Sequence, residues 1–286
     1  MKKPISFTGV IVGLMLIAAV SLSGSAGLWQ TFSVPPIIVG AITALLLQWV
    51  GFAVAWRYQT ERFFDLLGSG TFLVIVLMML AGSRSNLGLL DIFLGAAVSV
   101  WAIRLGWFLV ARIRLTGSDK RFEKIKADFL WFLMTWTLQG TWVVVTSVAA
   151  VSVIGDGEAQ QIGLIEAIGF TIWALGMTIE VVADEQKKKF RRAGTDSFIR
   201  TGLWSRSRHP NYFGEVLLWS GLSLSALPSL NGWQLMTLVS PIFVWTLLIK
   251  VSGVPMLEAK ADHRWRDDAS YAEYKKNTPL LVPRLW

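Results

Sequence analysis

The chain contains no cysteine, which excludes disulfide bonds and thiolate metal ligands. Its two histidines, His209 and His263, leave little scope for a histidine-rich metal centre, so we expect no metal site. Charged residues are also scarce, at 16% of the 286 residues, whereas hydrophobic residues make up 53%. The mean hydropathy of +0.53 is too high for a soluble domain of this size. The composition therefore predicts a multi-pass membrane protein.

Eight apolar segments are long enough, or nearly so, to cross a bilayer as helices. We expect these spans near residues 5–25, 35–56, 66–83, 88–111, 129–154, 162–184, 211–227 and 234–257. The segment 211–227 is short, so the prediction is an all-α bundle of seven to eight transmembrane helices. The helix that begins near residue 162 should continue beyond the membrane through Lys187–Arg192 and end at Gly194.

The placement of the basic residues predicts the orientation of the chain. With eight spans, all but three of the 27 lysines and arginines lie on one face of the membrane. Arg84 lies on the other face, and Arg104 and Lys250 lie within spans. By the positive-inside rule, both termini are then cytoplasmic. Because the loops are short, we expect a single membrane domain over residues 1–286.

The most informative stretch is Gly202-Leu-Trp-Ser-Arg-Ser-Arg-His-Pro-Asn-Tyr-Phe-Gly-Glu215. Pro210 suits the first position of a helix, where its missing N–H costs nothing. The free N–H groups and the positive end of the helix dipole then face Arg206, Arg208 and His209, which is a favourable arrangement for binding an anion. A basic cluster that touches anionic lipid headgroups is the alternative interpretation.

Two polar residues inside this helix support the anion site over the lipid contact. Asn211 and Glu215 are four residues apart, so they share one face of the helix. An ionisable group about one turn inside an apolar helix is costly and is usually functional or paired. Contact with lipid headgroups would explain the arginines but not these two side chains.

Acidic pairs also occur at two other helix ends. Glu180 and Asp184 are spaced i,i+4, and Arg191 follows on roughly the same face. A carboxylate beside arginines can bind a ribose hydroxyl while the arginines bind phosphates, although an ordinary charged helix end has the same pattern. Glu61 and Asp65 form a second i,i+4 pair, at the start of an apolar helix. They could cap that helix, or hold and relay a proton at the floor of a pocket.

Arg104 lies in the middle of an apolar span. An arginine inside a bilayer must face the bundle interior and find a carboxylate. Glu61, Asp65 and Asp91 are candidates, and the sequence does not choose among them. The fifteen tryptophans are typical of interfacial belts and packing.

The last residues form a polar, aromatic tail that includes Glu258, His263 and Tyr274. The tail lies on the same side of the membrane as the Arg-His-Pro stretch. It could fold over a bound cofactor, or lie as an amphipathic segment on the membrane surface.

These motifs are similar to those of a known family. Arg208-His-Pro-Asn-Tyr-Phe-Gly-Glu215, with Glu258, His263 and Tyr274 behind it, resembles the C-terminal domain of steroid 5-alpha-reductases. The stretch Thr60-Glu-Arg-Phe-Phe-Asp-Leu-Leu-Gly68 is similar to the bacterial branch of that superfamily, often catalogued as a domain of unknown function. The resemblance therefore suggests a multi-pass protein of the bacterial inner membrane.

The resemblance implies a membrane-embedded, NADPH-dependent reductase of a conjugated C=C bond in an apolar carbonyl substrate, such as a 3-oxo-4-ene steroid or a similar lipid. Residues 1–160 would form the substrate cavity, and residues 161–286 would bind NADPH. With the anion site described above, the candidate cofactor-binding residues are Asp184, Arg191, Arg200, Arg206, Arg208, His209, Asn211, Tyr212, Glu215, His263 and Tyr274. The expected partners are the substrate and membrane lipids, with no nucleic acid.

The family's catalytic pair is a glutamate and a tyrosine that bind the substrate carbonyl. The glutamate falls near Glu61 or Asp65, with Asp65 slightly favoured. The tyrosine falls near Trp101, and since tryptophan has no phenol proton, Tyr58 is the further catalytic candidate. Trp101 and Arg104 are the candidate substrate-binding residues.

The core Arg-His-Pro-x-Tyr-x-Gly is also shared with integral membrane methyltransferases of the isoprenylcysteine carboxyl methyltransferase type, which use S-adenosylmethionine. The many arginines favour a polyphosphorylated cofactor over a single methionine carboxylate. A transporter or a structural membrane protein, the third class considered, would not need this cytoplasmic cluster.

Overall fold

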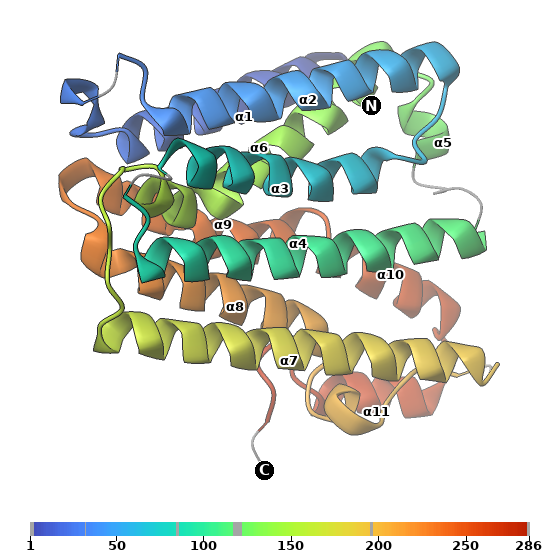
Figure 1. Cartoon of the computed structure of the whole chain (residues 1–286). Helices are drawn as coiled ribbons and strands as arrows, with labels where there is room; N and C mark the ends of the chain where they lie inside the picture. The colour runs from blue at the N-terminus through green and yellow to red at the C-terminus, as the bar shows by residue number, and fades with distance from the viewer. Residues whose placement is uncertain (1–2, 32, 84–85, 117–121, 195–196, 285–286) are drawn as a thin grey trace. The chain divides into compact units, whose positions relative to one another are not determined.

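A computed structural model describes most of the chain. The described residues are 3–31, 33–83, 86–116, 122–194 and 197–284, and Arg84, used in the orientation argument, lies outside them. Every regular element in these ranges is helical, which confirms the all-α prediction (Figure 1). Packing divides the chain into two compact units, Met1–Glu166 with Ala226–Ser240, and Ala167–Ser225 with Pro241–Trp286. We call them the first and the second unit.

The first unit is built around one central helix. Its helices are α1 (Lys3–Gly24), α2 (Pro36–Tyr58), α3 (Phe64–Gly82), α4 (Leu89–Thr116), α5 (Phe122–Ile125) and α6 (Phe129–Ile154), with the short helices η1 (Leu28–Gln30), η3 (Leu227–Ser229) and η4 (Gly232–Val239). The helices α1 to α4 and η4 all pack against α6. Most of α6 is therefore buried, with 89% of its most apolar window inside the protein.

Local signals explain where two of these helices begin. The helix α2 starts at consecutive prolines, with Pro36 at the position where a missing N–H costs nothing. The helix α6 starts after Asp128, whose side chain accepts a hydrogen bond from the backbone N–H of Trp131 at 2.9 Å. The apolar residues that follow continue each helix.

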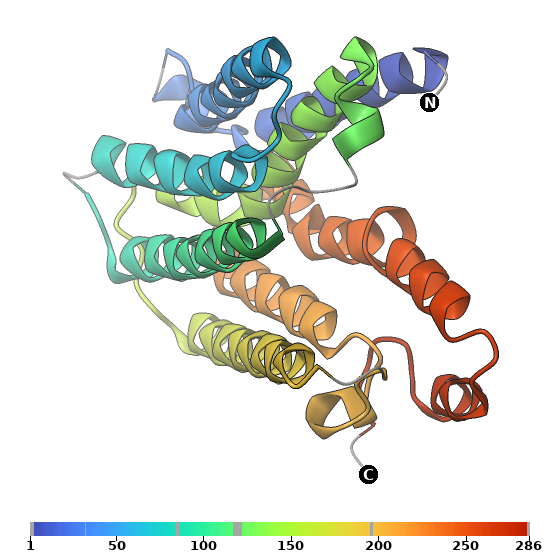
Figure 2. The ribbon, with the colours of Figure 1, turned by 90° about the vertical axis from the view of Figure 1, so that its right-hand side faces the viewer.

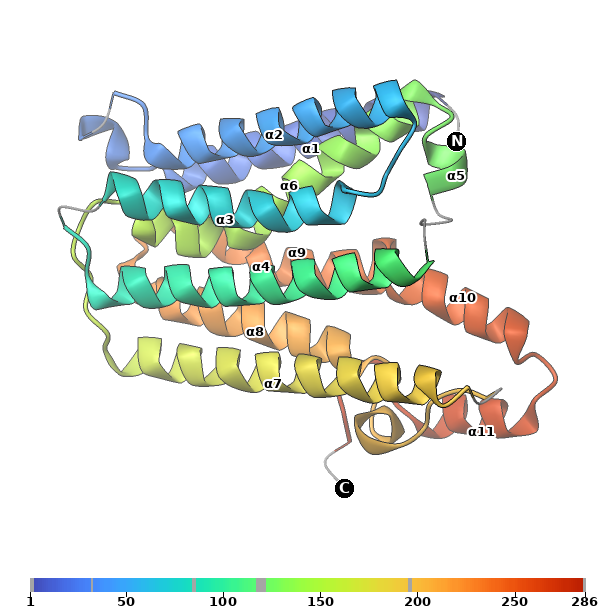
Figure 3. The same ribbon diagram turned by 45° about the vertical axis from the view of Figure 1, so that its right-hand side comes forward.

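The second unit contains a long helix pair followed by shorter elements. Its elements are α7 (Leu164–Arg192), η2 (Gly202–Ser205), α8 (Pro210–Ala226), α9 (Ser240–Thr246), the π-helical turn η5 (Leu247–Val251), α10 (Val254–Arg264) and α11 (Ala269–Asn277). The helices α7 and α8 lie side by side, in yellow and orange, in Figure 1, Figure 2 and Figure 3. As predicted, α7 runs through Arg192, and Gly194 follows it with a φ of +66° that suits glycine.

Seven helical stretches in the described residues are long and apolar enough to cross a membrane. They are Pro4–Gly24, Pro36–Tyr58, Phe64–Gly82, Leu89–Val110, Phe129–Ile154, Leu164–Arg192 and Gly232–Arg264. These stretches confirm a multi-pass membrane protein. The predicted seventh span, 211–227, corresponds to α8, which is helical but has 17 residues and is not among these seven stretches. The predicted span 234–257 is a succession of η4, α9, η5 and α10 rather than one regular helix.

Candidate functional site

The start of α8 brings together two residues of the Arg-His-Pro motif and one acidic partner. The helix begins at Pro210, as predicted. Glu258, on α10, forms an ion pair with Nη1 of Arg208 through Oε2, and its Oε1 lies 2.9 Å from Nε2 of His209. Nζ of Lys275 lies 3.6 Å from Oε2 of the same carboxylate. Arg208 and His209 thus share an internal carboxylate, a partner that the sequence argument did not assign to them.

Three polar atoms around this cluster are buried and have no hydrogen-bond partner in the structure: Nε of Arg208, Nδ1 of His209 and Oδ1 of Asn211. The other half of the Asn211 amide is used, since Nδ2 donates to Oδ1 of Asp184 at 3.3 Å. Buried polar atoms in proteins are almost always hydrogen-bonded. The start of α8 therefore offers donor and acceptor atoms that suit a polar ligand.

The tyrosines on either side of this cluster have different surroundings. The ring of Tyr212 stacks on that of His209, with centroids 5.6 Å apart and planes inclined by 9°. The hydroxyl of Tyr274 donates to the carbonyl oxygen of Trp204 at 2.7 Å, and burial raises the pKa of Tyr274 to about 12. Tyr274 therefore acts within the protein as a hydrogen-bond donor that attaches α11 to η2.

The remaining cofactor candidates lie outside the cluster formed by Arg208, His209 and Glu258. Arg191, Arg200 and Arg206 are exposed, and the guanidinium carbon of Arg200 lies 5.7 Å from the centroid of the Phe198 ring. His263 is also exposed, in the last turn of α10. Glu215 is half-buried, one turn into α8 after Asn211. Because these arginines are exposed, they can reach anions in the solvent.

The C-terminal tail packs directly on the Arg-His-Pro stretch. The backbone N–H of Arg208 donates to the carbonyl oxygen of Pro279 at 2.9 Å, and Oγ of Ser207 donates to the carbonyl oxygen of Leu281 at 2.7 Å. Phe198 contacts the rings of Tyr271 and Tyr274 at centroid distances of 5.2 and 5.3 Å. The tail is thus part of the second unit, next to the residues that the sequence assigns to the cofactor.

The catalytic candidates lie in the first unit, in three different surroundings. Glu61 is buried, at 4% exposure, and its Oε2 lies 2.8 Å from Nζ of Lys126. Asp65 is half-buried in the first turn of α3. Tyr58 is 72% exposed, with the guanidinium of Arg57 over its ring. Of these three side chains, Glu61 is buried, Tyr58 is exposed, and Asp65 is intermediate, partly buried and partly accessible to solvent.

The substrate-binding candidates lie on α4. Trp101 is fully buried, and its ring packs against Phe72 and Trp142 at centroid distances of 5.2 and 5.9 Å. Arg104 is half-buried on the same helix. Trp101 thus packs within the first unit, and its role in substrate binding stays a prediction.

One proposed partner of Arg104 is corrected by the structure. Asp91 lies in the first turn of α4, where its Oδ2 accepts a hydrogen bond from the backbone N–H of Gly88 at 2.7 Å. At about 1.5 Å of rise per residue, Asp91 and Arg104 are separated by roughly 20 Å along the helix axis. Asp91 is therefore a cap of α4 and not the partner of Arg104.

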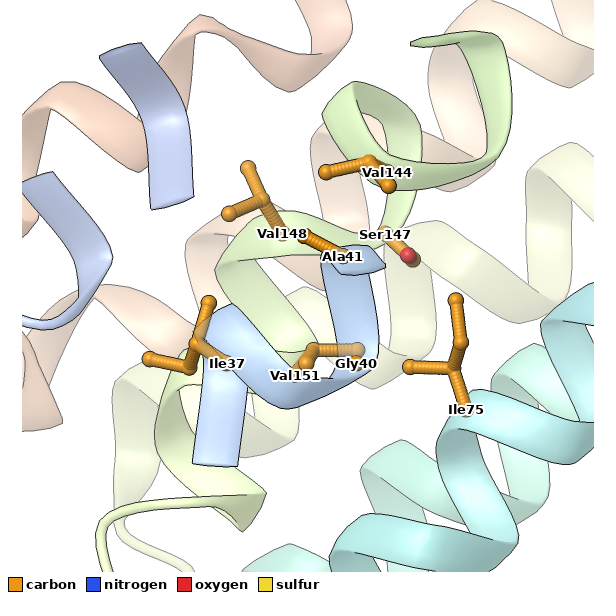
Figure 4. A pocket seen from close by; sticks show the side chains of 8 residues that line it. All are labelled: Ile37, Gly40, Ala41, Ile75, Val144, Ser147, Val148 and Val151. Carbon is orange, nitrogen blue, oxygen red and sulfur yellow. The ribbon is translucent and has the colours of Figure 1, made fainter. Parts of the chain in front are cut away.

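A small cavity lies between α2, α3 and α6 in the first unit (Figure 4). It is lined by Ile37, Gly40, Ala41, Ile75, Val144, Ser147, Val148 and Val151, and its volume is about 10 Å³. That volume corresponds to about one water molecule, whereas small-molecule sites measure about 300–1,000 Å³. The only hydroxyl in this lining, that of Ser147, donates to the carbonyl oxygen of Val143 at 2.8 Å. This cavity is therefore not a substrate site.

Sequence reasoning named Glu258 as part of the tail and of the family motif but did not pair it with Arg208 and His209, and it assigned no role to Lys126. Glu258 and Asp262 are spaced i,i+4 on α10, and Lys275 contacts both, so the pattern of paired carboxylates was a usable signal. Lys126 carries no such signal, because its partner Glu61 is 65 residues away along the chain.

The fold and the site define a multi-pass helical membrane protein with a polar cluster at the start of a short helix. The family model described as a protein of unknown function (DUF1295) matches residues 51–278, so the chain belongs to that family. The predicted membership of the steroid 5-alpha-reductase-like superfamily is confirmed by this match and by curated relatives.

The curated relatives are named 3-oxo-5-alpha-steroid 4-dehydrogenase 1. The protein from Macaca fascicularis is 31% identical over 121 residues, 42% of this chain and 41% of that protein. The human protein is 29% identical over 121 residues, with the same shares of 42% and 41%, and the Rattus norvegicus protein is 28% identical over 117 residues, 40% of each chain. The chain thus spans about two fifths of the length of the curated relatives it matches. No solved structure matches it.

Proposed function

We propose that this protein is a membrane-embedded, NADPH-dependent reductase of a conjugated C=C bond in an apolar carbonyl substrate, such as a 3-oxo-4-ene steroid or a similar lipid. The observation that carries the proposal is the set of buried polar atoms without partners on Arg208, His209 and Asn211. The similarity to 3-oxo-5-alpha-steroid 4-dehydrogenases supports the class of reaction.

The residues at the start of α8 fit a dinucleotide phosphate. The side chain of Asn211 is left with an acceptor atom, and when His209 donates from Nε2 to Glu258, its neutral Nδ1 is an acceptor as well. Hydroxyl and amide groups of a nucleotide can donate to such atoms. The exposed guanidinium groups of Arg200 and Arg206 suit its phosphates. The reduced nicotinamide, when bound, supplies a hydride.

On the substrate side, Asp65 is the residue that we assign to the carbonyl oxygen. Hydride adds to the carbon β to the carbonyl, and negative charge builds on the carbonyl oxygen. The α carbon then takes a proton from solvent, which completes the reduction. A protonated Asp65 would donate a hydrogen bond to the carbonyl oxygen, and this hydrogen bond strengthens as the negative charge builds. The contact therefore acts on the transition state more than on the bound substrate.

The proposed location is the bacterial inner membrane, with both termini in the cytoplasm. The basic residues of the second unit then face the compartment that contains NADPH. The apolar substrate would be a membrane-soluble molecule, and the remaining partners would be membrane lipids.

Ligand-dependent melting of the detergent-purified protein tests the proposal. A ligand that binds the folded state at about 100 times its Kd stabilises that state by about 2.7 kcal/mol. NADPH should raise the melting temperature more than NADH does, because the arginines can also bind the 2′-phosphate. S-adenosylmethionine is the control ligand. A shift with S-adenosylmethionine and none with NADPH would identify a methyltransferase instead.

A further inference from the structure

The segment between α2 and α3 is held by side chains from another part of the first unit. Glu61 pairs with Lys126 at 2.8 Å, and Nε2 of Gln139 on α6 donates to the carbonyl oxygen of Phe64 at 2.8 Å. We propose that Glu61 is a tether, a residue that holds the α2–α3 segment in place, and not the reacting acid, and that Lys126 and Gln139 are positioning residues for the turn that carries Asp65. This inference rests on the proposed reductase function.

The surroundings of Glu61 explain why it suits a tether. Its side chain is 3% exposed, and that of Lys126 is 27% exposed, so the pair is largely removed from water. A buried carboxylate in an apolar bundle requires a compensating charge. A carboxylate bound to an ammonium group is an acceptor, and it has no proton to donate to a substrate carbonyl. The chemistry that the reaction needs from an acid is therefore not available at Glu61 while the pair is intact.

Gln139 belongs to a chain of polar groups that crosses the apolar interior of the first unit. Its Nε2 also donates to Oε1 of Gln48 at 3.0 Å, and Nε2 of Gln48 donates to Oγ1 of Thr71 at 2.8 Å. Gly68 makes this approach possible, because a Cβ atom there would lie 2.8 Å from Nε2 of Gln139. Connected polar networks in such an interior rigidify their surroundings. This network joins α2, α3 and α6 next to the helical turn that carries Asp65.

A double-mutant cycle tests the tether. Glu61→Gln and Lys126→Met keep the size of each side chain, and Lys124→Met, at an exposed position two residues away, is the matched control. Each variant is assayed for melting temperature and for NADPH oxidation with a panel of apolar enones. Each single variant should lower kcat by roughly tenfold, and the double variant should be no slower than either, because both changes break the same pair. Lys124→Met should behave as wild type.

Two further variants separate positioning from chemistry. Asp65→Asn should lower kcat by about a hundredfold or more, as expected for loss of the acid. Glu61→Gln should keep the pH dependence of kcat, since the titrating acid is still present. Gln139→Leu should lower kcat with little change in KM, because it loosens the turn that bears Asp65 without touching the substrate.

Several results would overturn the tether. One is a complete loss of turnover in Glu61→Gln while Lys126→Met keeps the wild-type rate, since Glu61 would then be the acid. Additive changes in melting temperature, or an unchanged kcat in Gln139→Leu, would contradict the positioning roles. If the wild type reduces no enone, the proposed function fails, and the melting temperatures alone decide the tether: non-additive changes support it and additive changes reject it.

Discussion

Asn211 uses half of its side-chain amide within the protein. Nδ2 donates to Asp184, whereas Oδ1 is buried without a partner. Asn211→Ala should therefore lower the melting temperature of the ligand-free protein only slightly, because it removes one long hydrogen bond, from Nδ2 to Asp184 at 3.3 Å, and Oδ1 contributes none. It should weaken NADPH binding by about tenfold, or about 1.4 kcal/mol, if the nucleotide donates a hydrogen bond to that atom. Titration of NADPH followed by intrinsic tryptophan fluorescence measures the affinity.

The matched control for this variant is Asn277→Ala, at an exposed position at the end of α11. It should change neither the melting temperature nor the affinity. A large loss of stability in Asn211→Ala with unchanged NADPH affinity would assign Asn211 to the fold and not to the cofactor.

At the scale of the elements, α7 and α8 approach one another backbone to backbone. A Cβ atom on Gly214 would lie 2.6 Å from the carbonyl oxygen of Gly176, and one on Gly176 would lie 2.5 Å from the backbone nitrogen of Leu218. Small residues at such contacts let membrane helices pack closely. Gly214→Ala should force the helices apart and lower the free energy of unfolding by about 1–3 kcal/mol, measured by thermal melting.

Gly70→Ala provides the control for this effect. Gly70 lies within α3, and no atom lies within 4 Å of a Cβ placed there. Alanine should stabilise that helix by about 0.5–1 kcal/mol because of its higher helix propensity. Wild-type melting of Gly214→Ala would show that the two helices do not approach as closely as the structure has them.

For the whole molecule, the distribution of basic residues predicts the topology. Reporter fusions at residues 30 and 158 should lie outside the cytoplasm, and fusions at residue 200 and at the C-terminus should lie inside. A fusion at residue 229, just after the 17-residue α8, decides whether this short helix crosses the membrane. We expect the reporter at residue 229 to lie outside the cytoplasm.

The control is a fusion at residue 127, between α5 and α6, which should read as cytoplasmic whether or not α8 spans. A cytoplasmic reading at residue 158 would reject the predicted orientation. A reporter at residue 229 that lies in the cytoplasm would reject the predicted seventh span, 211–227, while leaving the first six in place.

The elements could be predicted because their signals are local. Pro210 marks the start of α8 and Gly194 follows the end of α7, since each residue type has a backbone preference that suits its position. The same reasoning did not find that Trp101 is packed between Phe72 and Trp142. An aromatic residue in an apolar span is compatible with a belt, a cavity wall or a core, and only the neighbouring helices distinguish these surroundings.

The sequence by itself determined the class of this protein: apolar length sets the spanning helices, and the family match over residues 51–278, with the similarity to curated relatives, identifies the superfamily. Only the tertiary structure decided the pairing of the ionisable residues. Glu258 binds Arg208 and His209, and Glu61 binds Lys126, across 49 to 65 residues of chain. Helix packing brings these side chains together and removes them from water. In the protein interior an unpaired charge is costly, so a partner of opposite charge is favoured.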